Sequence, residues 1–228
     1  MPPLTGISSM ATRQVLAELV DTYERETGGK VAIESVGGVD AAKRVRAGER
    51  FDVAILASNV IDQLIAEGHA LPGSRVDLVR SGVAIAVRAG APKPAIGSED
   101  AVRDAVRRAR SVSYSTGPSG DYLAKLFERW GIAGEIADRI VKPAPGIPVG
   151  KLVAEGSVEL GFQQLSELLF VPGVDVLGPL PPAIQHVTTF SGGVCATTSR
   201  TDEARRLLAF MASPATAEAK RRQGMEPA

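Results

Sequence analysis

Three short segments rich in serine, threonine and glycine are the parts of this sequence best suited to chemistry. They are Ser8-Ser9, Gly37-Gly38 and the run from Thr116 to Gly120. Each lies between a predicted strand and a predicted helix, where backbone N–H groups lack an intrahelical partner. Such amides, with serine hydroxyls beside them, bind anions without any lysine. One turn of this kind is ordinary helix capping, but three at the ends of neighbouring strands indicate a shared anion pocket.

Strands alternate with helices along the whole chain, and this order positions the three turns. Apolar residues at one-face helical spacing predict a helix over 11–27, closed by Gly28-Gly29. Asp40 is expected to cap the helix that follows the second strand. The continuous apolar run 53–57 is typical of a buried parallel strand. We therefore expect an α/β fold with mainly parallel sheets and helices on both faces, with ligands bound beyond the carboxyl ends of the strands.

Composition and charge exclude several classes of function. Of the 228 residues, 44% are apolar and 23% charged, which is normal for a globular protein with a sizeable core. The 26 basic and 26 acidic residues give a formal net charge of zero, which argues against nucleic-acid partners. A lone cysteine, Cys195, excludes an intrachain disulfide, and neither histidine has a ligand partner at helical spacing. We expect no metal and no cofactor.

The sequence also bears on membranes and on the compartment. It has no run of about 18 apolar residues, so no membrane insertion is expected. The first four residues lead directly into a predicted strand, without the charged and apolar regions of a leader peptide. The compartment stays open: periplasmic if a signal peptide has been removed, cytoplasmic otherwise. The chain is expected to act as a monomer.

Six segments carry a resemblance to a known family. They are SSM at 8–10, AKRVRAG at 42–48, FDV at 51–53, YSTGPSG at 114–120, LGFQ at 160–163 and ASPA at 212–215. Together they resemble the molybdate-binding-protein-like (ModA-like) family of type II periplasmic binding proteins. The resemblance implies a two-lobed fold with a cleft between the lobes. Lobe 1 is expected to comprise 1–86 and 190–228, and lobe 2 to comprise 87–189.

The resemblance implies that side chains of this chain contact an anion, but two of the family's contacts are missing. The family's first hydroxyl falls on Ser9, which is kept. Its second hydroxyl falls on Gly38, and its tyrosine falls on Gln164, or on Gln163 if the alignment shifts by one residue. A missing hydrogen bond to a buried charged ligand costs about 1.5–3 kcal/mol. We therefore expect a ligand other than molybdate, and Gly38 opens space for a larger one.

Further contacts come from backbone amides and from one arginine. By the same resemblance, amide donors fall on Ser119 and on Gly146 or Ile147. Arg80 stands at the start of a predicted strand, where a guanidinium suits a carboxylate, although a surface arginine is the plainer interpretation. The two glutamines cannot both face the ligand, because strand side chains alternate. The expected ligand-binding residues are Ser8, Ser9, Gly38, Arg80, Ser119, Gly146, Ile147, Gln163 and Gln164.

Several functions follow from this resemblance. The first is binding of a di- or tricarboxylate, favoured over an inorganic oxyanion, with an ABC transporter permease as the partner. The second is an isomerase, because a branch of the family resembles aconitate isomerase, which moves a proton on a tricarboxylate. The third is the molybdate- or tungstate-binding component of an ABC transporter. A regulatory ligand-binding domain is disfavoured, because no helix-turn-helix precedes the domain. The candidate bases for an isomerase are Glu34, Asp40, Lys151 and Glu167.

Overall fold

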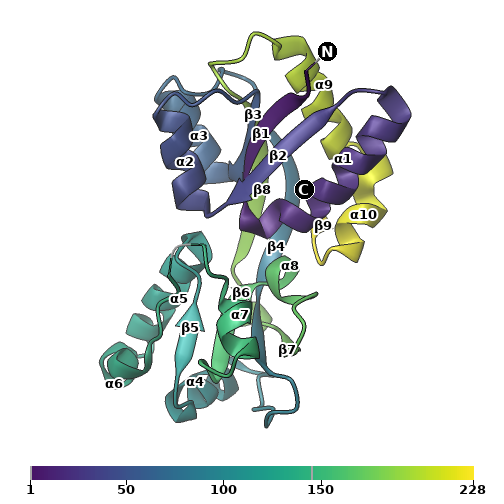
Figure 1. The fold of residues 1–228 in the computed structure, drawn as a ribbon. Coiled ribbons are helices and arrows are strands. Elements are labelled where there is room, and N and C mark those ends of the chain that lie inside the picture. Colours follow the sequence, from purple (N-terminus) through teal and green to yellow (C-terminus); the bar gives the residue numbers. More distant parts are fainter. Residues whose placement is uncertain (1, 145) are drawn as a thin grey trace. The chain divides into compact units, whose positions relative to one another are not determined.

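The chain forms two compact units in the computed structural model, which describes residues 2–144 and 146–228 (Figure 1). Unit 1 comprises the residues up to Ser81 together with Thr188–Ala228, and unit 2 comprises Gly82–Val187. The sequence predicts these two boundaries a few residues later, after 86 and after 189. Unit 1 is therefore discontinuous in sequence, whereas unit 2 is one continuous stretch.

Unit 1 alternates strands and helices. Its elements are β1 (Leu4–Ser9), the 3-10 helix η1 (Met10–Thr12), α1 (Arg13–Thr27), β2 (Val31–Val36), α2 (Gly38–Arg46), β3 (Val53–Ala57), α3 (Ser58–Ala66), the first part of β4 (Val76–Arg88), most of β8 (Val187–Val194), α9 (Thr201–Ala212), η4 (Pro214–Thr216), α10 (Ala217–Arg222) and β9 (Glu226–Pro227). Strand β1 pairs in parallel with β2 and β3, and β3 pairs antiparallel with β8. The first part of β4 pairs antiparallel with β9.

The sheet of unit 1 is buried on both faces, as the apolar run of β3 predicts. Val53 and Ile55 pack in a core with residues of α1 and α9, whereas Ala54 and Leu56 pack with residues of α2 and α3. Figure 1 shows α1 and α10 on one face of this sheet and α2 and α3 on the other. Side chains that alternate along one strand thus supply two separate cores.

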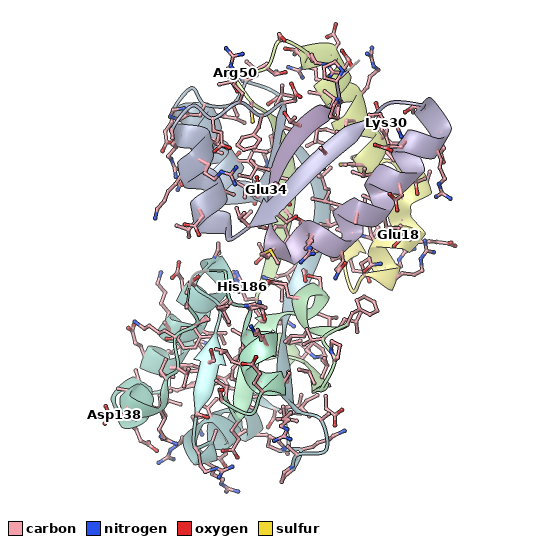
Figure 2. All side chains as sticks on the ribbon, viewed as in Figure 1. Glu18, Lys30, Glu34, Arg50, Asp138 and His186 are labelled. Atoms are coloured by element: carbon pink, nitrogen blue, oxygen red, sulfur yellow. The ribbon has the colours of Figure 1, made fainter. Side chains whose placement is uncertain are left out.

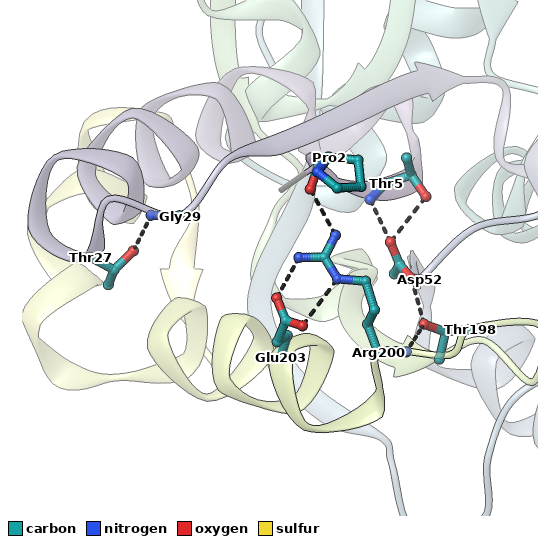
Figure 3. A network of polar contacts seen from close by, with 8 residues as sticks. All are labelled: Pro2, Thr5, Thr27, Gly29, Asp52, Thr198, Arg200 and Glu203. Atoms are coloured by element: carbon teal, nitrogen blue, oxygen red, sulfur yellow. Dashed lines mark hydrogen bonds and ion pairs between the residues drawn. The ribbon is translucent and has the colours of Figure 1, made fainter.

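A polar network ties the two sequence-distant parts of unit 1 together (Figure 3). The Asp52 carboxylate accepts hydrogen bonds from the Thr5 amide at 2.7 Å and from the Thr198 hydroxyl. Arg200 forms an ion pair with Glu203 and donates to the Pro2 carbonyl oxygen at 2.9 Å. The start of β1 is therefore held by the segment that leads into α9.

Unit 2 contains a second sheet with its own helices. Its elements are the rest of β4, α4 (Glu99–Arg108), β5 (Val112–Tyr114), α5 (Pro118–Arg129), α6 (Ala133–Ile136), η2 (Ala137–Arg139), α7 (Val149–Ala154), β6 (Leu160–Gln164), α8 (Leu165–Leu168), β7 (Val174–Pro179) and η3 (Pro182–Ile184). Strand β6 pairs in parallel with β5 and antiparallel with β4, and β7 pairs antiparallel with β4. Phe127 and Phe162 are fully buried in the core beneath α4 and α5.

Two details of the predicted architecture need correction. The sheets are mixed rather than mainly parallel, because β4, β8 and β7 run antiparallel to the strands that they join. Only the β-α-β segments of each unit give parallel pairs, as expected. Asp40 does not cap α2: the helix begins at Gly38 with Gly37 as its N-cap, and Asp40 lies in the first turn. An acidic residue there still favours the positive end of the helix dipole.

Candidate functional site

The end of β1 places two serines next to each other in different surroundings. The Ser8 hydroxyl lies 2.8 Å from the Ser35 hydroxyl on β2, so it has a partner within the sheet. Ser9 is buried, with 7% of its surface exposed, and its Oγ has no hydrogen-bond partner among the residues that the structure describes. A buried hydroxyl without a partner costs about 1–3 kcal/mol. A ligand oxygen that bonds here would offset that cost, which favours the predicted role of Ser9.

Gly38, the first residue of α2, lies against Ser9. A Cβ placed on Gly38 would stand 3.6 Å from the Ser9 Cβ, and among the described atoms it would meet no other neighbour within 4 Å. Glycine therefore leaves open space beside the Ser9 hydroxyl instead of relieving a clash. The first-turn amides of α2 lie next to this space and have no intrahelical acceptor. Unit 1 thus brings together two of the predicted site residues.

Arg80 has a contact that the sequence does not reveal. It lies on β4 opposite Glu226 of β9, and it is exposed. Its guanidinium donates from Nε and Nη2 to the Pro227 carbonyl oxygen, at 3.2 and 3.0 Å. In this arrangement Arg80 attaches the C-terminal strand to β4. Its predicted contact with a carboxylate stays a prediction.

In unit 2, the turn after β5 holds Ser119, a predicted ligand-binding residue. Helix α5 begins at Pro118, which suits the first position because proline lacks the N–H that would be unpaired there. Ser119 follows and is buried, and its Oγ lies 2.8 Å from the Ser115 Oγ across the turn. Ser115 is a member of this turn that sequence reasoning missed. The spacing of two serines four residues apart across a strand-to-helix turn is the signal that would have identified it.

The conformation of this turn depends on Gly120. A Cβ at this position would lie 1.6 Å from the Ser115 carbonyl oxygen, which is a backbone atom that cannot move without displacing the turn. The Gly120 amide also donates to the Gly117 carbonyl oxygen at 2.8 Å. Close approach of two backbone segments therefore explains why position 120 is glycine. The same close approach holds Ser119 beside Ser115.

The predicted amide donors at Gly146 and Ile147 lie in a different turn of unit 2. The Ile147 amide donates to the Ala144 carbonyl oxygen at 3.0 Å, so it is engaged within the turn. Gly146 has a φ of 77°, a conformation that favours glycine. Pro145, between them and Ala144, lies outside the described residues. The contact of either position with a ligand stays a prediction.

The end of β6 holds both predicted glutamines, and both are buried. Gln164 lies opposite Val83 of β4 in the sheet register, and Gln163 lies opposite Ala84. The side-chain oxygen of Gln163 accepts from the Gly150 amide at 3.1 Å, and its Nε2 donates to Oε1 of Glu167 at 2.8 Å. Because strand side chains alternate, only one of the two amides shares a side of the sheet with Glu167. That residue is Gln163.

Glu167 differs from the other candidate bases in its surroundings. Glu34 lies on β2 (Figure 2), where the hydrogen bonds of the Arg44 guanidinium lower its pKa. Asp40 is exposed, and Lys151 is exposed beside Glu155 at 3.8 Å.

Burial raises the pKa of Glu167 from its ordinary value of 4.5 to about 7, although the hydrogen bond from Gln163 works in the opposite direction. A carboxyl group with a pKa near neutrality both takes up and releases a proton under ordinary conditions. Among the four predicted bases, Glu167 has the surroundings that general acid–base chemistry requires.

Two further features concern the kind of site that the chain can form. No helix within 2–144 and 146–228 is both long enough and apolar enough to cross a bilayer. Over these same residues, His, Cys, Asp and Glu side chains do not gather in groups of three that would suit a metal ion. The side chains of Ser9, Ser119, Gln163 and Gln164 end in hydroxyls and amides, which can donate hydrogen bonds.

Comparison with known proteins places these observations in context. The model of the family described as bacterial extracellular solute-binding protein matches residues 4–226. An aconitate isomerase from Pseudomonas sp is 38% identical, over 98% of this chain and 87% of that protein.

Solved structures show the same fold at low identity. The periplasmic molybdate-binding protein of Azotobacter vinelandii has a TM-score of 0.81 at 20% identity, covering 97% of this chain and 98% of its own. The sulfate-binding protein of Mycobacterium tuberculosis has a TM-score of 0.81 at 15% identity, covering 100% of this chain and 87% of its own. These likenesses confirm the predicted type II periplasmic-binding-protein fold. Because the family model spans nearly the whole sequence, the chain belongs to the bacterial extracellular solute-binding protein family.

Proposed function

We propose that this protein isomerises a tricarboxylate of the aconitate type, with Glu167 as the group that moves the proton. The observation that carries the proposal is the half-buried Glu167 carboxyl, whose pKa burial raises to about 7 and whose Oε1 is held by Gln163. The substrate class comes from the aconitate isomerase that is 38% identical over 98% of this chain.

The proposed reaction needs a single residue that acts first as base and then as acid. The Glu167 carboxylate takes a proton from the methylene carbon next to the double bond of the tricarboxylate. The electron pair of that C–H bond delocalises through the double bond into the neighbouring carboxylate. The Glu167 carboxylic acid then returns its proton to the carbon at the other end of this system, so the double bond moves and the net charge is unchanged. A pKa near the working pH serves both half-reactions.

Donors in unit 2 suit the charge that develops during this transfer. Helix α5 begins at Pro118, and its N-terminal end carries a partial positive charge. The hydroxyls of Ser115 and Ser119 lie at this helix end and can donate to carboxylate oxygens. Hydrogen-bond donors that are already in place favour a delocalised carbanion without any rearrangement in the transition state.

Proton exchange with solvent tests the proposal. The full chain is incubated with cis- or trans-aconitate in deuterated water, and the ligand is followed by NMR. We expect interconversion of the isomers, with deuterium entering the methylene position. Glu167→Gln should abolish both processes, whereas Glu155→Gln, which changes an exposed carboxyl in the same unit, should leave both rates unchanged. Wild-type protein that binds aconitate without isomerisation or exchange would contradict the enzyme proposal.

A second candidate is a binding protein for a di- or tricarboxylate without chemistry of its own, with an ABC transporter permease as its partner. The buried Ser9 hydroxyl, which has no partner among the described residues, favours ligand binding whether or not a reaction follows. Melting temperatures separate the ligand classes. A ligand at a hundred times its dissociation constant stabilises the folded state by about 2.7 kcal/mol. For a chain of this length, that is a shift of about 5–10 °C. The carboxylates should give this shift and molybdate should not; the reverse result would restore an oxyanion-binding function.

A further inference from the structure

Gln163 occupies a position between a helix terminus and the proposed base. It lies on β6, and 3% of its surface is exposed. Its side-chain carbonyl oxygen accepts from the amide of Gly150, in the first turn of α7, at 3.1 Å. Its Nε2 donates to Oε1 of Glu167, one helical turn beyond β6, at 2.8 Å. One buried amide therefore joins α7 to the carboxyl group on α8.

The two hydrogen bonds fix which way the Gln163 amide points. A backbone N–H only donates, so the group that faces Gly150 must be the carbonyl oxygen. The NH₂ group is thereby turned towards Glu167, whose ionised carboxylate only accepts. In a flipped amide, the Gln163 oxygen would face the Glu167 carboxylate, and the Gln163 NH₂ group would face the Gly150 N–H. Both contacts would be repulsive. The Gly150 amide thus determines that Gln163 presents a donor to Glu167.

The carboxyl oxygens of Glu167 differ as a result. Oε1 accepts the hydrogen bond from Gln163, and among the described residues Oε2 accepts none. The proton of a carboxylic acid is disfavoured on an oxygen that already faces an N–H donor, so it resides on the other oxygen.

We propose that Gln163 is a positioning residue: it holds Oε1 of Glu167 and leaves Oε2 as the oxygen that exchanges a proton with the substrate. This inference deepens the proposed isomerase function and rests on it for the identity of the substrate.

Among the described polar groups near Glu167, the Gln163 amide is the one that contacts its carboxyl group. Helix α8 packs on β6 and β7, and β6 has no titratable residue. On β7, Asp175 is bound to Lys93 at 2.9 Å. Lys151 on α7 and Glu155, which directly follows α7, are exposed and form an ion pair at 3.8 Å. Burial is the cause that raises the pKa of Glu167, and the Gln163 hydrogen bond lowers it. Among the described residues, no ion pair contributes to the pKa shift of Glu167.

The matching experiment replaces Gln163 by methionine, which has a similar volume and no donor. Loss of a hydrogen bond to the charged form should raise the pKa of Glu167 by about one to two pH units. This is measured in the ligand-free full chain by carbon-13 NMR of the Glu167 carboxyl. In the isomerase assay, Gln163→Met should lower kcat/KM at pH 7 by about 5–50-fold, in proportion to the lost carboxylate form. The loss should shrink as the pH rises towards 9, because the carboxylate form is then restored. A merely structural role would lower the rate equally at every pH.

A measurement on the wild-type protein covers the case in which Gln163→Met does not fold. The side-chain amide protons of Gln163 should shift with the titration of Glu167, at a midpoint of about 7. Gln185, whose amide binds the backbone of Val83, is the control that should not shift.

The outcomes separate the two proposals. An unchanged pKa of Glu167 in folded Gln163→Met, or Gln163 protons that do not follow the titration, would overturn the positioning role whatever the activity. A shifted pKa without any isomerase activity in wild type would uphold the Gln163 contact and refute the proposed function.

Discussion

Replacing Glu167 by glutamine should stabilise the ligand-free protein above neutral pH, although it removes the proposed base. Burial raises the pKa of Glu167 to about 7 in the folded state, whereas the unfolded chain keeps the ordinary value of 4.5. Between these two values, the unfolded state releases a proton that the folded state retains, so rising pH favours unfolding. This loss of folding stability is absent below pH 4.5 and complete above pH 7. At one pKa unit per 1.36 kcal/mol, it amounts to at most about 3 kcal/mol.

Glutamine suits this test because it has nearly the same volume and keeps a carbonyl oxygen for the Gln163 hydrogen bond. Urea unfolding of wild type and Glu167→Gln at pH 5 and pH 8 gives the free energies of unfolding. The stability gained by the variant should be below about 1 kcal/mol at pH 5 and should approach about 3 kcal/mol at pH 8. In thermal scans, the latter value corresponds to about 6–12 °C.

Glu159 in the same unit provides a control of opposite sign. Burial opposes its ionisation, but hydrogen bonds from the Arg110 amide and guanidinium outweigh burial and lower its pKa. Its ionised form therefore stabilises the fold above pH 4.5, and this stability is lost as the pH falls through the lowered pKa. Glu159→Gln should accordingly destabilise the protein at pH 8 more than at low pH. A pH-independent difference between wild type and Glu167→Gln would refute the raised pKa, and with it the choice of Glu167 as base.

Three further substitutions test individual contacts. Ser9→Ala should leave the ligand-free protein at least as stable as wild type in thermal scans, because within 2–144 and 146–228 its Oγ has no partner. Calorimetry should show a carboxylate affinity about 10–100-fold lower. Lower stability with unchanged affinity would instead make Ser9 a structural residue. Gly120→Ala should cost about 3 kcal/mol in urea unfolding, because its Cβ would lie 1.6 Å from the Ser115 oxygen; wild-type stability would contradict this turn geometry. Arg80→Ala should cost about 1 kcal/mol of stability by releasing Pro227. If the carboxylate-induced melting shift disappears while stability stays, Arg80 is a ligand clamp.

Local sequence signals predicted the strand-to-helix turns. The serines at 8–9 and the segment 116–120 lie where the alternation of strands and helices places them. Ser98, a residue type that favours helix starts, caps α4 by accepting a hydrogen bond from the Ala101 amide at 3.2 Å. These features depend on residues within one or two turns of each other, and short-range spacing carries that information.

Contacts between distant segments could not be predicted in this way. The role of Arg80 depends on Pro227, which is 147 positions further along the chain. The link from Gly150 through Gln163 to Glu167 requires the packing of α7 and α8 on the same strand. The sequence named Glu167 among four bases, but its distinction is burial, which is a property of the packed unit. The correction at Asp40 has a simpler cause, because glycine also begins helices well and the helix starts three residues earlier than the capping pattern suggests.

The discontinuity of unit 1 has a consequence for the order in which the protein forms during synthesis. The chain of unit 2 is complete at Val187, and its two ends meet where the Val83 amide donates to the His186 carbonyl oxygen. Unit 1 at that moment still lacks β8 and α9, and with them the core residues Phe190, Leu207 and Leu208. A ribosome adds about 5–20 residues per second, so the apolar face of β3 and α1 stays uncovered for several seconds after unit 2 can fold. This interval is when the nascent chain is most exposed to aggregation, and a chaperone that binds it would recognise the half-built sheet of unit 1.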